Sequence, residues 1–311
     1  MVQGREQAPW LTELAMGGVM LFWGLNYVVL KFGLRQVSPE TFTLVRFLLA
    51  GPVILGLHRV LSGRLYLPRR DIFGLIGVGL LGISVYQTLF SAAVQDTTAA
   101  AASLLIAISP IFTALLAPLF GEARSGLRNW LGMAISVIGT AGLLLVSGGL
   151  ASATAPHPLL GDVLSLGASI SWALYSILAR PLLVRHPPVL VVGWTSLAGA
   201  VGLLPFGVAG LTALSRADLA SWMSLMFAVF LVTAYGLVVW QIGIQRMGTV
   251  RTMVYLYMVP VIASIAGVIW IGEPVRPLEA VCGGVVLLGM IVARSPSRDR
   301  KAREQISQIE A

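Results

Sequence analysis

The chain has little charge and one cysteine, and it lacks the residue clusters on which most enzymes depend. Charged residues make up 11% of its 311 residues and apolar residues 57%, which excludes a soluble enzyme. The single cysteine, Cys282, lies in an apolar segment and excludes an intramolecular disulfide. The sequence holds no Walker loop and no His, Cys and carboxylate cluster with metal-ligand spacing. We therefore expect no ATP hydrolysis, no metal site, no cofactor and no enzymatic activity.

Carboxylates are also missing from the interiors of the apolar segments. All thirteen lie in tails, in loops or at segment ends, and the three histidines are peripheral too. A proton relay normally needs a titratable group at depth in the membrane. We therefore expect no proton-coupling carboxylate at the midplane. This leaves facilitated diffusion, or coupling through a group at the edge of a cavity.

Long apolar runs are what the chain does contain. A helix needs roughly 20 apolar residues to cross a bilayer, and these runs are too long and too continuous for barrel strands. They predict an all-α integral membrane protein with ten transmembrane helices. The expected spans are 12–34, 38–61, 71–94, 98–120, 126–147, 158–180, 188–210, 219–243, 249–271 and 276–293.

The second half of the chain repeats the first. Trp23 aligns with Trp172 and Tyr86 with Tyr235 at an offset of 149 residues, and Pro110 aligns with Pro260 after one inserted residue. Each half holds five spans, an odd number, so the second half must enter the membrane from the opposite side. Inverted repeats are typical of alternating-access transporters, with the substrate site between the halves.

Basic residues predict the orientation. Sixteen lie at the side that holds both termini and four at the other side, which favours cytoplasmic termini. The basic excess then faces the anionic inner leaflet and not a nucleic acid. The predicted organisation is a cytoplasmic segment 1–11, a first five-helix repeat 12–147, an outer linker 148–157, a second repeat 158–293 and a cytoplasmic tail 294–311.

Three motifs resemble a known family. They are LFWGLNYVVLKFGL in the first span, SPIFTALLAPLFGE in the fourth, and VPVIASIAGVIWIGE, which echoes the fourth in the ninth. With the inverted repeat they resemble the EamA type of the drug/metabolite transporter superfamily. The resemblance implies export of a small-molecule substrate across the bacterial inner membrane, through a cavity lined by spans one, three, four, six, eight and nine. The chain is most similar to exporters of aromatic and other neutral amino acids.

Other functions fit the same sequence pattern. Within transport, the alternative is an exporter of nucleosides, sugar-nucleotides or drugs. From other classes, the alternatives are a non-saturable channel or a membrane scaffold. The residue types repeated in both halves favour a transporter over these two. No oligomeric state follows from the sequence.

Aromatic rings with polar tips and polar residues at depth mark a candidate cavity. Tryptophan or tyrosine can also form an interfacial belt, and polar side chains can bond between helices. Met253 and Tyr257 are four residues apart, which places them on one helix face. The candidate substrate-binding residues are Trp23, Asn26, Tyr27, Tyr86, Gln87, Ser103, Trp172, Tyr175, Tyr235, Met253 and Tyr257.

Two prolines and one arginine also lie within spans. Pro110 and Pro260 occupy equivalent mid-span positions, where a missing N–H bends a helix, so we expect gating or kink positions there. Arg46 either contacts a carboxylate or has a structural role. The second span is peripheral in the resembled family and the repeat mate of Arg46 is Thr195, which together favour the structural role.

Overall fold

The computed structural model describes residues 9–62, 64–97, 99–146, 157–271 and 277–294, and these residues are helical throughout, apart from short connections. Nine helical segments in this part of the chain are long and apolar enough to cross a membrane. The all-α membrane class is therefore confirmed. The predicted linker 148–157, apart from His157, and nearly all of both predicted tails lie outside the described residues.

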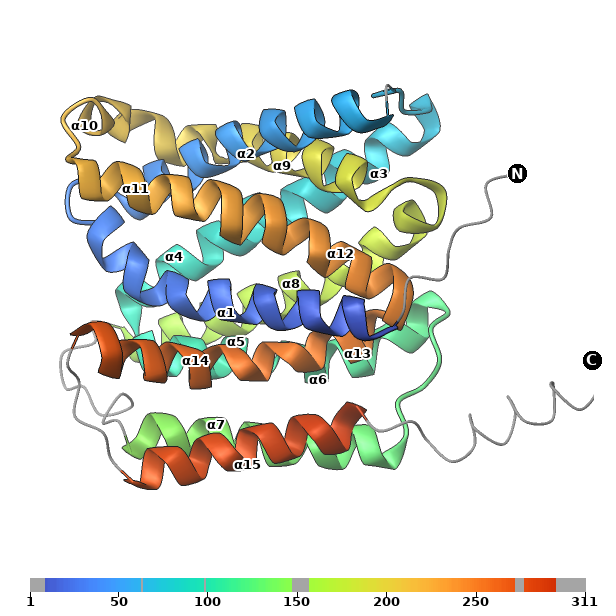
Figure 1. Cartoon of the computed structure of the whole chain (residues 1–311), viewed down its shortest axis with the longest axis vertical. Helices are drawn as coiled ribbons and strands as arrows, with labels where there is room; N and C mark the ends of the chain where they lie inside the picture. The colour runs from blue at the N-terminus through green and yellow to red at the C-terminus, as the bar shows by residue number, and fades with distance from the viewer. Residues whose placement is uncertain (1–8, 63, 98, 147–156, 272–276, 295–311) are drawn as a thin grey trace, which may run out of the picture.

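The helices follow the expected spans closely (Figure 1). The first half comprises α1 (Pro9–Gly33), α2 (Pro39–Ser62), α3 (Arg69–Gly79), η1 (Leu80–Val85), α4 (Tyr86–Asp96), α5 (Ala99–Ile106), α6 (Ser109–Leu116), η2 (Ala117–Phe120) and α7 (Leu127–Val146). The second half comprises α8 (Pro158–Arg185), α9 (Pro188–Gly207), η3 (Val208–Gly210), α10 (Leu211–Leu214), α11 (Leu219–Phe227), η4 (Ala228–Tyr235), α12 (Gly236–Met247), α13 (Thr249–Met253), η5 (Val254–Tyr257), α14 (Met258–Ala266), η6 (Gly267–Ile271) and α15 (Pro277–Arg294).

The fourth expected span is broken into α5 and α6. Pro110 has no N–H to give to the carbonyl of Ile106, and its ring crowds that carbonyl. The freed oxygen accepts hydrogen bonds from the hydroxyls of Ser109 (2.6 Å) and Ser169 (3.4 Å). The longest apolar helical piece of this fourth span is Leu104–Phe120, which is shorter than the nine candidate spans. The expectation of ten crossings therefore stays a prediction at this span.

The third span of each half contains a π-helical segment, η1 in one and η4 in the other. A π-helical turn leaves backbone carbonyls without their usual helical partner. The carbonyl of Leu81 accepts a bond from the Ser171 hydroxyl (2.7 Å), and that of Val232 accepts one from the Trp23 indole (3.0 Å). Each π-segment is thus bonded to the first helix of the other half.

The packing of helices is the same when the two halves are exchanged. Helix α1 packs against the η4 span and α14, and α8 packs against the η1 span, α5 and α6. The two second helices, α2 and α9, pack together, and so do the two fifth helices, α7 and α15, at one edge (Figure 1). An exchange-symmetric arrangement is what a two-repeat transporter fold requires.

The first helices of the two halves begin at opposite ends of the bundle. Where α1 begins and α8 ends, Arg180 pairs with Glu122 (3.0 Å) and Arg294 with Glu13 (2.6 Å); we call this the Arg180 end. Where α1 ends and α8 begins, Thr97 donates to Asp162 (3.0 Å) and Gln95 donates to Glu40 (3.4 Å); we call this the Glu40 end. The first helices of the two halves therefore run in opposite directions, as an inverted repeat requires, while five crossings in each half stay a prediction.

Candidate functional site

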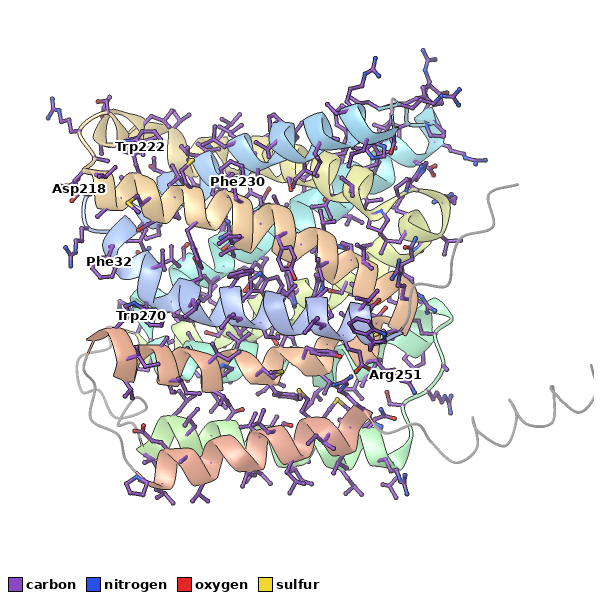
Figure 2. All side chains as sticks on the ribbon, viewed as in Figure 1. Phe32, Asp218, Trp222, Phe230, Arg251 and Trp270 are labelled. Carbon is purple, nitrogen blue, oxygen red and sulfur yellow. The ribbon has the colours of Figure 1, made fainter. Side chains whose placement is uncertain are left out.

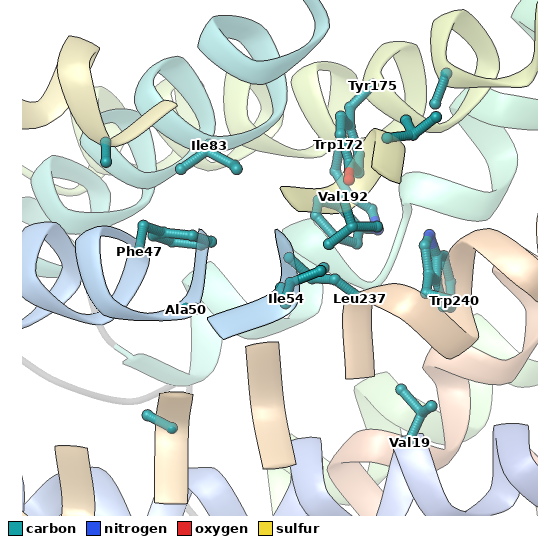
Figure 3. Packing of buried hydrophobic residues seen from close by; sticks show 14 of the residues in the cluster. Val19, Phe47, Ala50, Ile54, Ile83, Trp172, Tyr175, Val192, Leu237 and Trp240 are labelled. Atoms are coloured by element: carbon teal, nitrogen blue, oxygen red, sulfur yellow. The ribbon is translucent and has the colours of Figure 1, made fainter. Parts of the chain in front are cut away.

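Five aromatic side chains meet at the centre of the bundle, and we call them the aromatic cluster: Trp23, Tyr86, Trp172, Tyr175 and Trp240. Trp172 is their hub, with ring centroids 5.2 Å from Tyr86 and Tyr175 and 5.8 Å from Trp23 and Trp240. The rings come from α1, α4, α8 and α12, so both halves contribute. Figure 3 shows Trp172, Tyr175 and Trp240 within the buried core.

The sequence predicted four members of this cluster and missed Trp240. Trp240 is fully buried, its indole lies 5.2 Å from that of Trp23, and its N–H donates to the Ser176 hydroxyl (3.4 Å). Trp240 was not among the predicted residues, although it lies inside the expected span 219–243 and α12 continues past it to Met247. A tryptophan inside a span, with its polar tip, was the signal that could have found it.

Several polar atoms beside these rings have no hydrogen-bond partner among the described residues. They are the Asn26 amide oxygen, the Trp172 indole N–H, the Tyr175 hydroxyl and both amide atoms of Gln241. The Tyr175 hydroxyl is close to Gln241 and Thr195, but the groups do not meet hydrogen-bonding geometry. A buried polar atom without a partner costs roughly 1–3 kcal/mol, so each is a point where water or a ligand would be bound favourably.

A cavity of about 180 Å³ opens between α2, α4 and α9 near the Glu40 end. Six of its nine lining residues are polar by type; the nine are Glu40, Thr43, Gln87, Thr88, Ser91, Ala92, Gln95, Leu203 and Phe206. Gln87 directly follows Tyr86 of the aromatic cluster on α4, and among the described residues no member of the cluster itself lines the cavity. Of the predicted residues, Gln87 lines this cavity, and its binding role stays a prediction.

Similarity to known proteins assigns the chain to a class. The EamA-like transporter family matches residues 10–145 and again residues 159–295, once in each half. The chain belongs to the EamA-like transporter family. This confirms the resemblance drawn from the motifs. It makes the protein a membrane transporter of the drug/metabolite type, and its helices and bacterial relatives support a multi-pass protein of the inner membrane.

Relatives of this EamA-like transporter include named exporters. It is 29% identical over 302 residues to the "Probable terminal-alkyne amino-acid exporter" of Streptantibioticus cattleyicolor, covering 96% of this chain and 97% of that protein. It is 27% identical to the "Probable amino-acid metabolite efflux pump" of Escherichia coli K12, covering 91% and 95%. A solved crystal structure matches with a TM-score of 0.74 at 20% identity, covering 91% of this chain and 96% of that one. At that identity the structural match shows the fold alone.

Other predicted residues of the EamA-like transporter lie apart from the aromatic cluster. Tyr235 packs edge-on against Phe22 (5.5 Å), and its hydroxyl donates to the carbonyl of Ala15 (2.9 Å). Tyr27 is 45% exposed on α1, although it is within electrostatic range of the Tyr86 hydroxyl of the cluster. Ser103 lies on α5, and its side chain is outside the described residues. Binding roles for these three stay predictions.

Met253 and Tyr257 do not share a face as the i, i+4 spacing predicts. Tyr257 is the last residue of the 3₁₀ segment η5, which begins directly after Met253, and a 3₁₀ turn has three residues and so rotates the later side chain away from the α-helical position. Met253 packs in the main hydrophobic cluster, whereas Tyr257 packs with Ala114, Met133 and Val286 of a second one. In this conformation both side chains are fully buried.

The two equivalent prolines follow irregular helix geometry in the fourth span of each half. Pro110 lies at the start of α6, after the break that ends α5, and Pro260 lies in the first turn of α14, after η5. The residue four positions before each proline therefore lies in or beside non-α geometry, as the missing N–H requires. Their gating role stays a prediction.

Ion pairs between the halves gather at the Arg180 end. Asp71 of α3 is bound by Arg185 (3.0 Å) and His186 (2.8 Å) from the end of α8. Glu122 pairs with Arg180 and also accepts a bond from the Thr249 hydroxyl. Among the described residues no group of three His, Cys, Asp or Glu side chains could hold a metal. The ion pairs of Asp71 and Glu122 link side chains of the two halves.

Proposed function

We propose that this protein is a secondary transporter that exports small metabolites, above all aromatic and other neutral amino acids, by alternating access around a central cavity. The observation that carries the proposal is the convergence of Trp23, Trp172 and Trp240 beside unpartnered polar atoms. Aromatic walls suit an apolar side chain, and isolated polar groups suit the ends of an amino acid. The names of two amino-acid exporters among its relatives support the same substrate class.

Alternating access is supported by the difference between the two ends of the bundle. Arginine–carboxylate pairs link the halves at the Arg180 end, whereas at the Glu40 end the contacts are those of Asp96 with His157 (3.1 Å) and of Thr97 with Asp162, and the 180 Å³ cavity opens near them. We place both termini in the cytoplasm, because basic residues concentrate at the Arg180 end. With that orientation the described conformation is open towards the outside. The repeats in this proposal are 12–147 and 158–293, with Pro110 and Pro260 as hinge positions.

Counterflow in proteoliposomes tests the proposal. Vesicles loaded with unlabelled phenylalanine, tryptophan or methionine should take up the labelled amino acid with saturation. Trp172→Ala should lower the rate at least tenfold, because it removes the hub of the aromatic cluster. The matched control is Trp222→Ala, since Trp222 is an exposed tryptophan in the first turn of α11 near the Glu40 end (Figure 2).

Three results would contradict the proposal. Exchange of nucleosides, sugar-nucleotides or drugs, with none of any amino acid, would assign a different substrate class. Flux that does not saturate and shows no counterflow would indicate a channel. Absence of flux for every compound, in vesicles that contain folded protein, would favour a scaffold.

A further inference from the structure

Arg46 is a cation in the interior of a membrane-spanning helix. It lies in the second turn of α2, and its Nε donates a hydrogen bond to the hydroxyl of Thr233 in η4 (2.5 Å). Its guanidinium also lies over the neighbouring Phe47 ring, 4.9 Å from the centroid. Among the described residues no carboxylate forms an ion pair with it. A charge at this depth is costly in a bilayer and is retained where it has a partner or a ligand.

The surroundings of Arg46 connect the cavity to the aromatic cluster. Thr43, one helical turn before Arg46, lines the 180 Å³ cavity together with Gln87. The Arg46 guanidinium is within electrostatic range of the Tyr86 hydroxyl, and Tyr86 is in contact with Trp172. A substrate held at this point would have a polar end beside Arg46 and an apolar end towards the tryptophans.

The guanidinium has unused hydrogen-bonding capacity. Arginine has five N–H donors in a planar fork, and Thr233 takes the one on Nε. The terminal nitrogens have no partner among the described residues. Those two nitrogens match the two oxygens of a carboxylate, which arginine binds in a bidentate manner. The ligand chemistry that fits is therefore a planar carboxylate, as on a free amino acid.

The other half of the chain has no equivalent group. The repeat mate of Arg46 is Thr195, which is fully buried and donates to carbonyls of its own helix, those of Val191 (2.9 Å) and Val192 (3.2 Å). A single cation in one half would fix one orientation of a substrate that is itself asymmetric.

We propose that Arg46 binds the substrate carboxylate, so that a free carboxylate is required for recognition. The structure thereby favours the ligand-binding role of Arg46 over the structural role that the sequence favoured. This inference rests on the proposed export of amino acids. It adds the group that is recognised and the residue that recognises it.

Competition for counterflow of labelled phenylalanine tests this inference. The competitors are phenylalanine, 3-phenylpropionate, which keeps the carboxylate, and phenylalaninamide, which loses it. In the wild-type protein we expect the amide to compete at least tenfold more weakly than phenylalanine, with 3-phenylpropionate closer to phenylalanine. Arg46→Gln should raise the KM for phenylalanine at least tenfold and remove the preference over the amide. Arg46→Lys should recover part of it, because lysine keeps the charge and loses the fork.

The matched control is Arg216→Gln, which removes an exposed arginine from the connection before α11 and should leave the preference unchanged. If Arg46→Gln fails to fold, the comparison of competitors on the wild-type protein still decides, together with ligand-induced shifts of its melting temperature. Equal competition by phenylalanine and its amide would overturn the role of Arg46 and leave amino-acid export intact. Absence of exchange for every amino acid would overturn both proposals.

Discussion

Gly289 and Gly284 lie on the same helix, α15, and their substitution by alanine should have opposite effects on the stability of the protein. A Cβ at Gly289 would lie 2.5 Å from the backbone nitrogen of Ser136 and 2.7 Å from the carbonyl oxygen of Gly132, both on α7. A Cβ at Gly284 would meet nothing within 4 Å. Gly289→Ala should therefore destabilise the protein, whereas Gly284→Ala should stabilise it.

The size of the effect follows from the distances. Ordinary contacts of a Cβ begin at 3.4 Å, so Gly289→Ala must separate α7 and α15 by about 0.9 Å against backbone atoms that cannot rotate away. A gap of that size forfeits about a quarter to a half of the dispersion energy of the atoms along it. We expect a cost of about 2 kcal/mol. Gly284→Ala should gain about 0.5–1 kcal/mol, because alanine restricts the unfolded chain and favours helix.

Thermal unfolding of the purified variants in detergent measures both effects. The two midpoints should differ by roughly 5 °C or more, with the wild-type protein between them. Transport per folded molecule should be unchanged in both variants, because α7 and α15 contribute no member of the aromatic cluster. Equal midpoints, or a Gly289→Ala protein more stable than the wild type, would refute the close approach of these helices.

Two further predictions concern charged groups at the ends of the bundle. Glu122→Gln should cost about 1–2 kcal/mol of thermal stability, since the Glu122 side chain is only 9% exposed and its loss leaves Arg180 unpaired. The double variant with Arg180→Gln should recover part of the loss, and additive losses would contradict a direct pair. At the other end, the backbone N–H of Ser221 donates to Asp218 (2.8 Å) and, with the Ser221 side chain, holds the pKa of that carboxyl below its usual value of 3.8. The stability that the ionised Asp218 carboxylate contributes is therefore present above that value and is lost as the pH falls through the lowered pKa. The difference in melting temperature between the wild type and Asp218→Ala should then vanish in strong acid. A difference that persists there would assign the effect to something other than the charge.

The apolar runs predicted the helices well because membrane-spanning length is a local property of the sequence. The departures occur where the backbone depends on partners elsewhere in the chain. The break before Pro110 is stabilised by Ser169, and the π-segments are bonded by Ser171 and Trp23. These partners lie 63, 90 and 209 residues away in the sequence. Pattern and propensity within one span cannot reveal them.

The candidate site was predictable to the extent that the repeat marks it. Trp23 and Trp172 are repeat mates, and their rings do meet across the two halves. Trp240 was missed because no tryptophan or tyrosine lies at the equivalent position of the first half, so the repeat does not mark it. Met253 and Tyr257 were paired by an α-helical spacing that η5 does not have. The role of Arg46 could not be judged from its own span, because the relevant contact is with Thr233 of η4.

The ion pairs at the Arg180 end bear on rate more than on affinity. Asp71, Glu122 and Glu13 each bind an arginine of the other half there, and none of them belongs to the aromatic cluster or lines the 180 Å³ cavity. If the halves alternate, these pairs must separate before the Arg180 end opens, so they stabilise the conformation described and leave the substrate contacts alone. Glu122→Gln should then change the maximal rate of counterflow and hardly alter the KM, whereas Arg46→Gln should do the reverse. A matching shift in KM for both variants would mean that the charged end and the binding site are not separate parts of the mechanism.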